Sequence, residues 1–232
     1  MGKTPTRRLR GVFFDVGETL IDETREYGTW ADWLGVPRQT FSAVFGGVIA
    51  RGEDYRTTFE YFRPGFDLEA ERHRREEAGC PETFGAEDLY PDARGCLAAL
   101  RSQGLLVGIA GNQTARAERL LRQLDLPADI IATSAGWGVE KPARAFFDKI
   151  VSACGCRTSE VAYVGDRLDN DILPALDAGM VAVFLRRGPW GYLFASHPDT
   201  ARAHLRIESL EELPSRLRTL RVADPARWVL RP

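Results

Sequence analysis

Three aspartates and one lysine occupy positions where their side chains could do chemistry. Asp15 and Asp166 each end a short apolar run, Asp171 follows Asp166 by five residues, and Lys141 directly precedes Pro142. Carboxylates, together with waters and phosphate oxygens, are the ligands that Mg2+ prefers. A lysine can neutralise phosphate charge and keep nearby acids ionised, and a carboxylate can attack phosphorus to form an acyl phosphate. The residue types therefore indicate a divalent cation and a phosphate-like ligand.

Each of these residues alone has a simpler explanation. An acid at the end of a strand usually caps the next helix or lies in a solvated turn. The elements around the acids decide whether they converge. Short apolar runs typical of buried parallel strands occur at residues 11–15, 105–110, 129–133, 161–166 and 181–185.

Helical patterns alternate with these strands. Apolar residues recur at three- and four-residue steps over 92–103, 114–124, 143–154 and 169–178, and a surface helix is expected over 208–220. Strand-helix alternation predicts an α/β fold with a doubly wound parallel sheet. Ligands of such sheets gather beyond the carboxyl ends of the strands, so the acids should meet at one edge.

Residues 22–89 interrupt the alternation. They contain no buried-strand run, and Tyr55, Phe59 and Phe62 follow the spacing of an amphipathic helix. We expect a core domain of residues 1–21 and 90–232 and a small helical domain of residues 22–89. The aromatic residues of this insert could form its own core or a box for a substrate; they include Trp30, Trp33, Phe41, Phe45 and Phe66.

The motifs resemble those of the haloacid dehalogenase-like (HAD) superfamily. The segment from Asp15 to Leu20, Asp-Val-Gly-Glu-Thr-Leu, resembles its first motif, and Gly111-Asn112 stands where the second places Ser or Thr. Lys141, within Val-Glu-Lys-Pro, is similar to the third motif, and Gly-Asp-x4-Asp, ending at Asp171, is similar to the fourth. The resemblance implies a Rossmann-like core, with residues 22–89 as a type 1 helical cap.

The resemblance also implies a role for each matching position. Asp15 would be the nucleophile that accepts a phosphoryl group and a ligand of Mg2+. Gly17, through its carbonyl, and Asp166 would be further metal ligands. Asp171 would support the metal site or orient Lys141, which would pair with Asp15 and the phosphate. The implied activity is hydrolysis of a small phosphorylated compound, with the cap selecting the substrate.

Two positions depart from the motifs. The superfamily's phosphatases carry a general acid-base aspartate at the position of Gly17, and such catalysis typically contributes about 10² to 10⁴ in rate. Glu18 or a cap residue could substitute. Gly111 lacks the usual hydroxyl, although its backbone N–H and Asn112 could still bind phosphate. We expect weakened turnover, or else a degenerate member that binds a phosphorylated ligand or partner.

Other activities fit less well. A phosphonatase would draw a lysine from the cap, and residues 22–89 contain none. A haloacid dehalogenase needs no metal, whereas Asp166 and Asp171 resemble metal-site residues. Neither a dinucleotide-binding nor a Walker A glycine pattern is present, and no nucleophile elbow or Cys/His pair indicates a serine or cysteine hydrolase.

Composition narrows the function classes further. The chain has 232 residues, 44% of them hydrophobic, and a net charge of -2, which predicts neither a nucleic-acid partner nor a membrane partner. No apolar stretch approaches the roughly 18 residues of a membrane span. The N-terminus does not resemble a secretory signal, so we expect a cytoplasmic protein. The four cysteines lack metal-ligand spacing, and nothing indicates an oligomeric state.

Overall fold

The computed structural model describes residues 8–220. The chain divides into two compact units: one contains the residues up to Leu20 and from Tyr90 onward (unit 1), and the other is Ile21–Leu89 (unit 2). Each unit has its own buried core. In the described part of the chain, no helix is long and apolar enough to cross a membrane.

Unit 1 is built on a six-stranded parallel sheet with the order β3-β2-β1-β4-β5-β6. The strands are β1 (Gly11–Phe14), β2 (Leu106–Gly111), β3 (Ile130–Thr133), β4 (Val161–Gly165), β5 (Val181–Leu185) and β6 (Leu205–Ile207). The predicted doubly wound parallel sheet is confirmed. The strand order reverses at β1, which is where such folds bind ligands.

The strand register determines where Asp15, the residue after β1, lies in the sheet. Phe14 lies opposite Ile109 of β2 and Val164 of β4, so Asp15 emerges between the carboxyl ends of two neighbouring strands. Every residue of β1, β4 and β5 is buried, as expected of strands covered on both faces. The sequence did not reveal β6, because its three residues include an exposed Arg206 between two buried apolar residues.

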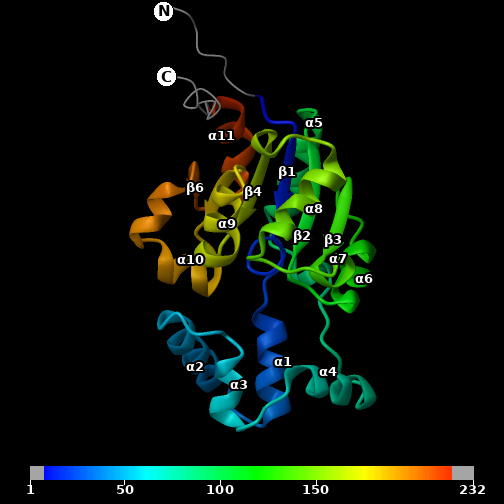
Figure 1. The fold of residues 1–232 in the computed structure, drawn as a ribbon. Helices are drawn as coiled ribbons and strands as arrows, with labels where there is room; N and C mark the ends of the chain where they lie inside the picture. Colours follow the sequence, from blue (N-terminus) through cyan, green and yellow to red (C-terminus); the bar gives the residue numbers. More distant parts are fainter. Residues whose placement is uncertain (1–7, 221–232) are drawn as a thin grey trace, which may run out of the picture. The chain divides into compact units, whose positions relative to one another are not determined.

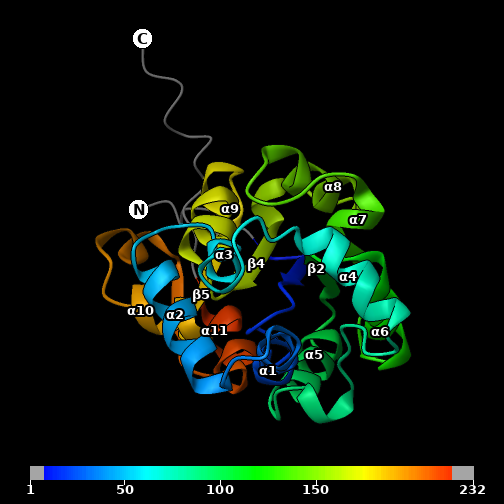
Figure 2. The ribbon, with the colours of Figure 1, turned by 90° about the horizontal axis from the view of Figure 1, so that it is seen from below.

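Helices cover both faces of the sheet. Figure 2 shows α8 and α9 on one side of the strands and α5 and α11 on the other. The helices of unit 1 are α5 (Ala93–Ser102), α6 (Ala115–Gln123), α7 (Ser134–Trp137), α8 (Arg144–Cys154), α9 (Leu173–Asp177), α10 (Gly188–Phe194) and α11 (Leu213–Thr219).

Two predicted helices differ in detail. The expected helix over 169–178 begins as a π-helical segment (Leu168–Ile172) and becomes α-helical only at α9. Pro174 lacks a backbone N–H and is accommodated in the first turn of α9. The expected surface helix over 208–220 is shorter, and its Leu213 and Leu217 are buried, so α11 contributes to the core.

Unit 2 contains four α-helices among the described residues, drawn in blue and cyan to green in Figure 1, and its buried core is aromatic. They are α1 (Thr24–Leu34), α2 (Arg38–Ala50), α3 (Thr57–Phe62) and α4 (Leu68–Glu77). Phe41 and Phe59 lie 5.5 Å apart between ring centroids, and Trp30 and Phe59 lie 5.3 Å apart, both edge to face, a preferred aromatic geometry. Trp30, Phe41, Phe45 and Phe59 are almost fully buried, which makes them the core of the unit.

Candidate active site

Lys141 joins two of the predicted acids. Its Nζ donates to Oδ1 of Asp15 and to Oδ1 of Asp171, each at 2.6 Å. The lysine is 3% exposed and Asp171 is fully buried. Burial alone would lower the pKa of Lys141, but the charges of Asp15 and Asp171 outweigh it and raise the pKa well above its usual value. Lys141 is therefore a fixed positive charge beside Asp15.

Asp171 has both carboxylate oxygens engaged. While Oδ1 accepts from Lys141, Oδ2 accepts from the backbone N–H of Arg167 at 3.0 Å. Its approach depends on Gly165, because a Cβ at that position would lie 2.7 Å from the Cβ of Asp171. Burial raises the pKa of Asp171 to about 6, with Lys141 acting in the opposite direction. The arrangement suits a carboxylate that orients the lysine.

Asp166 is buried without a full set of partners. It directly follows β4 and is 1% exposed, and its Oδ2 has no hydrogen-bond partner among the described residues. Burial raises its pKa well above the usual value, and the charges of Asp171 and Asp15 add to this shift. A buried carboxylate without a donor is costly. A bound cation would remove that cost.

The three acids suit a metal ion. Asp15, Asp166 and Asp171 each offer an oxygen, and these oxygens lie within 4.8 Å of one another. Hard oxygen donors are the ligands of Mg2+, and the unpaired Oδ2 of Asp166 supplies a position for one. The residues present therefore fit a hard divalent cation.

The second predicted motif supports Lys141 from the backbone. The side chain of Asn112 donates through Nδ2 to the carbonyl of Lys141 at 2.8 Å and accepts from its N–H at 2.7 Å. This pairing fixes the loop before α8. Since the amide side chain is used here, a role of Asn112 toward phosphate would rest on its backbone N–H.

Gly111 lies against the nucleophile candidate. A Cβ at this position would come within 2.6 Å of Oδ1 of Asp15 and 3.1 Å of Val16. The hydroxyl-bearing residue of the related motif would require Asp15 to shift. The glycine thus accommodates the observed carboxylate position, and its N–H is the group predicted to bind phosphate.

Glu18, which could substitute for the missing acid, lies in the turn after β1. Glu18 is buried, has a left-handed backbone with φ of 53°, and accepts a hydrogen bond from the Tyr90 hydroxyl at 2.6 Å. Gly188 is close by, since a Cβ there would lie 2.5 Å from the Cβ of Glu18. Gly17 itself keeps its carbonyl but has no side chain to transfer a proton.

The sequence analysis missed two supporting residues. Tyr163 donates to the carbonyl of Ala110 at 2.7 Å, and Lys141 Nζ lies 5.4 Å from its ring centroid. Tyr90 carries the Arg187 guanidinium 4.1 Å from its ring centroid. Tyr163 was read only as part of a buried strand, and no local pattern marks either residue as a neighbour of the acids.

The four cysteines take no part in this cluster. All are free thiols: Cys96 and Cys156 are buried, Cys154 is half-buried and Cys80 is exposed.

The fold and the motif residues identify the class of protein to which the chain belongs. A family model described as haloacid dehalogenase-like hydrolase matches residues 9–179, and the chain belongs to this family. It is thus a HAD-like hydrolase with the expected Rossmann-like core.

Two curated relatives that match most of the chain are named as phosphatases. The chain is 28% identical to a glyceraldehyde 3-phosphate phosphatase of Pyrococcus furiosus, over 84% of this chain and 88% of the relative. It is also 28% identical to a phosphoglycolate phosphatase of Yersinia pseudotuberculosis, over 85% and 90%. The fold is similar to that of a putative HAD hydrolase of Bacillus subtilis, with a TM-score of 0.67 at 19% identity over 91% and 99% of the two chains.

Proposed function

We propose that this protein is a Mg2+-dependent phosphohydrolase that acts on a small phosphorylated metabolite through an aspartyl-phosphate at Asp15. The observation that carries the proposal is the buried ion pair of Asp15 and Lys141 together with the buried Oδ2 of Asp166, which has no hydrogen-bond partner among the described residues. Such an orphaned carboxylate oxygen favours a cation ligand over a purely structural role. The names of the phosphatase relatives support the reaction class.

Asp15 performs the first step. One carboxylate oxygen forms a bond to phosphorus while the bond from phosphorus to the ester oxygen breaks, and the departing oxygen leaves with the electron pair. Lys141 holds the carboxylate in place and offsets negative charge on the phosphoryl group. Water then attacks phosphorus in the acyl phosphate, which releases phosphate and restores the Asp15 carboxylate.

The metal ion would be held by Asp15, Asp166 and the carbonyl of Gly17, with Asp171 supporting the site. When bound, Mg2+ supplies positive charge that stabilises the transferring phosphoryl group. Lys141 donates a hydrogen bond to Asp15, and the hydrogen bond from the backbone N–H of Arg167 holds Asp171 against the lysine. The N–H groups of Gly111 and Asn112 would donate to the phosphate.

Because Gly17 has no side chain that could protonate the leaving group, we expect the rate of hydrolysis to depend on the substrate. No acid at that position protonates the departing oxygen, which therefore takes its proton from water. Substrates whose leaving group is stable as an anion, such as acyl phosphates, should be hydrolysed faster than simple alkyl phosphates. Unit 2 is proposed as the cap that selects the substrate, and the cytoplasm as the location.

The test is a turnover assay with Mg2+ on a panel of phosphate esters and acyl phosphates. Asp15→Asn should abolish turnover while the circular dichroism spectrum shows that the variant stays folded, although removing one charge of the buried pair is expected to lower its melting temperature. Turnover that survives Asp15→Asn would contradict the nucleophile assignment.

A second candidate function follows from Gly17. A member without the general acid could bind a phosphorylated ligand or partner without turnover. Binding of a phosphate compound by the wild-type protein, with no hydrolysis of any ester or acyl phosphate, would favour this function over the first.

A further inference from the structure

A buried network of unit 1 holds the turn that follows Asp15. The turn contains Gly17, whose carbonyl is a proposed metal ligand, and Glu18, which has a left-handed backbone with φ of 53°. Such a conformation is unfavourable for a residue with a side chain and persists only where its surroundings hold it. The contacts of Glu18 and of the next residue, Thr19, therefore determine the path of the turn.

Glu18 is contacted by two distant segments of unit 1. Its Oε2 accepts a hydrogen bond from the Tyr90 hydroxyl at 2.6 Å, and only 7% of the residue is exposed. Gly188 approaches it so closely that a Cβ at position 188 would lie 2.5 Å from the Cβ of Glu18. The left-handed conformation of Glu18 thus depends on tertiary packing.

Arg187 connects the next residue of the turn to the same tyrosine. Its Nη1 donates to the carbonyl of Thr19 at 3.0 Å, and its Nη2 pairs with Asp92. The guanidinium also lies 4.1 Å from the ring centroid of Tyr90, which is within the range of a cation–π contact. The side chains of Arg187 and Asp92 are 12% and 9% exposed, so water has little access to these contacts.

Asp92 in turn fixes the guanidinium of Arg187. Its Oδ2 also accepts from the Ser209 hydroxyl and from the backbone N–H of Leu210, each at 2.9 Å. A carboxylate held by three donors keeps its position. Through Asp92, Arg187 therefore anchors the turn to the segment that follows β6.

We infer that Tyr90 and Arg187 are positioning residues of the proposed metal site, which hold the turn so that the Gly17 carbonyl stays in place for Mg2+. The inference rests on the proposed function, in which Gly17 contributes a ligand through its backbone alone. A backbone carbonyl cannot adjust by changing a rotamer, so its position depends on the path of the chain around it. Residues that support metal ligands from behind typically account for about 10- to 100-fold in metal affinity.

Tyr90→Phe tests the inference without changing any charge. The variant keeps the ring that faces Arg187 and removes the hydroxyl that donates to Glu18. Titration calorimetry should show Mg2+ binding weakened about tenfold and Ca2+ binding weakened by a smaller factor. Mg2+ demands near-ideal octahedral geometry, whereas Ca2+ accepts irregular coordination, so a displaced ligand affects Mg2+ more. Unchanged Mg2+ affinity, or equal losses for the two cations, would overturn the inference.

Tyr192→Phe is the matched control for the hydroxyl. Tyr192 also belongs to unit 1 and has an arginine, Arg186, 5.1 Å from its ring centroid, but its side chain is exposed. The control should bind both cations as the wild-type protein does. Thermal melts without Mg2+ show whether each variant is folded before its affinity is compared.

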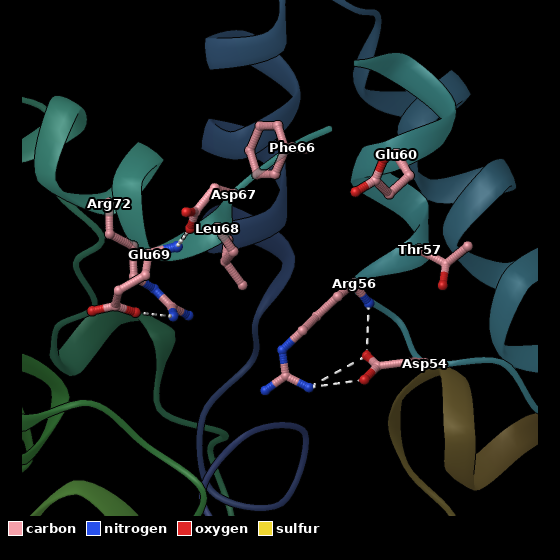
Figure 3. Close-up of a pocket in the computed structure, with 9 residues that line it drawn as sticks. All are labelled: Asp54, Arg56, Thr57, Glu60, Phe66, Asp67, Leu68, Glu69 and Arg72. Atoms are coloured by element: carbon pink, nitrogen blue, oxygen red, sulfur yellow. Dashed lines mark hydrogen bonds and ion pairs between the residues drawn. The ribbon is translucent and has the colours of Figure 1, made fainter. Parts of the chain in front are cut away.

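Arg187→Ala tests the other half of the network by the sign of its effect. Removal of a positive charge would by itself strengthen cation binding, whereas loss of positioning should weaken Mg2+ binding by about tenfold. Stronger Mg2+ binding in this variant would contradict the inference. Arg56→Ala is the control, because Arg56 combines the same groups within unit 2. It pairs with Asp54 at 3.1 Å (Figure 3) and lies 4.9 Å from the ring centroid of Tyr55, and its removal should leave Mg2+ affinity unchanged.

Failure of the proposed function gives a different result. If the wild-type protein binds Mg2+ but hydrolyses no phosphate compound, the proposed function fails, and a selective loss of Mg2+ affinity in Tyr90→Phe still supports the inference. If wild-type turnover depends on Mg2+ but Tyr90→Phe binds Mg2+ equally well, the inference fails and the proposed function stands. A wild-type protein without Mg2+ affinity would overturn the inference.

Discussion

At the scale of single residues, Gly165 determines whether Asp171 can reach Lys141. A Cβ at this position would be 2.7 Å from the Cβ of Asp171, which is held from both sides by Lys141 and Arg167. We expect Gly165→Ala to destabilise the protein by about 1–3 kcal/mol, the usual cost of overpacking, and to lower turnover.

Chemical denaturation and the turnover assay measure both effects. Gly95→Ala is the control, because Gly95 lies in α5 with open space around its Cβ position; it should be neutral or slightly stabilising. An equally stable and active Gly165→Ala variant would show that Asp171 does not need its observed position.

The residue at position 17 should determine how strongly turnover depends on the leaving group. In the wild-type protein, turnover should rise steeply as the leaving group becomes a better one, because no side chain at Gly17 supplies a proton. Gly17→Asp should raise hydrolysis of alkyl phosphates by tenfold or more and acyl phosphates by much less. Parallel assays of both substrate types measure this. Equal gains for both, or no gain, would place the acid elsewhere.

Asp166 should control metal binding independently of turnover. Because its buried Oδ2 has no partner among the described residues, Mg2+ should raise the melting temperature of the wild-type protein. Asp166→Asn should remove most of this increase, since the amide is a weaker, uncharged ligand. Differential scanning calorimetry with and without Mg2+ measures it. An undiminished increase in the variant would exclude Asp166 as a ligand.

At the scale of elements, α6 depends on the N-cap residue that precedes it, Thr114. The Thr114 hydroxyl accepts a hydrogen bond from the N–H of Ala117 at 3.1 Å and thereby caps the helix. Thr114→Ala should lower the free energy of unfolding by about 1 kcal/mol. Denaturant unfolding checks this, with Thr24→Ala as a control at a helix start where no side chain caps. Equal losses in both variants would argue against capping.

At the scale of the whole molecule, two units with separate cores should unfold separately. Phe59 packs against Trp30, Phe41 and Phe66, which all belong to unit 2. Phe59→Ala should cost about 3–5 kcal/mol and should increase hydrogen exchange in residues 21–89, leaving β1, β4 and β5 protected. Hydrogen exchange followed by mass spectrometry measures residues 21–89 and the strands of unit 1 separately. Phe147→Ala, in the core of unit 1, should give the reverse pattern, and uniform loss of protection would indicate one cooperative unit.

The sequence by itself determined the sheet and the identity of the acids. Buried parallel strands are continuous apolar runs, so β1, β4 and β5 were visible, and the carboxyl ends of such strands must share an edge. Short or alternating elements gave no such signal, which is why β6 and the π-helical start before α9 were missed.

Only the tertiary structure decided which groups the acids contact. Asp15, Lys141 and Asp171 are separated by 126 and 30 residues, and no local pattern specifies which oxygens they share. Likewise, Glu18 is adjacent to Gly17 in sequence, yet its left-handed backbone and its bond to Tyr90 fix its carboxylate. Side-chain direction and hydrogen-bond partners depend on contacts between distant segments, and these exist only once the chain is packed.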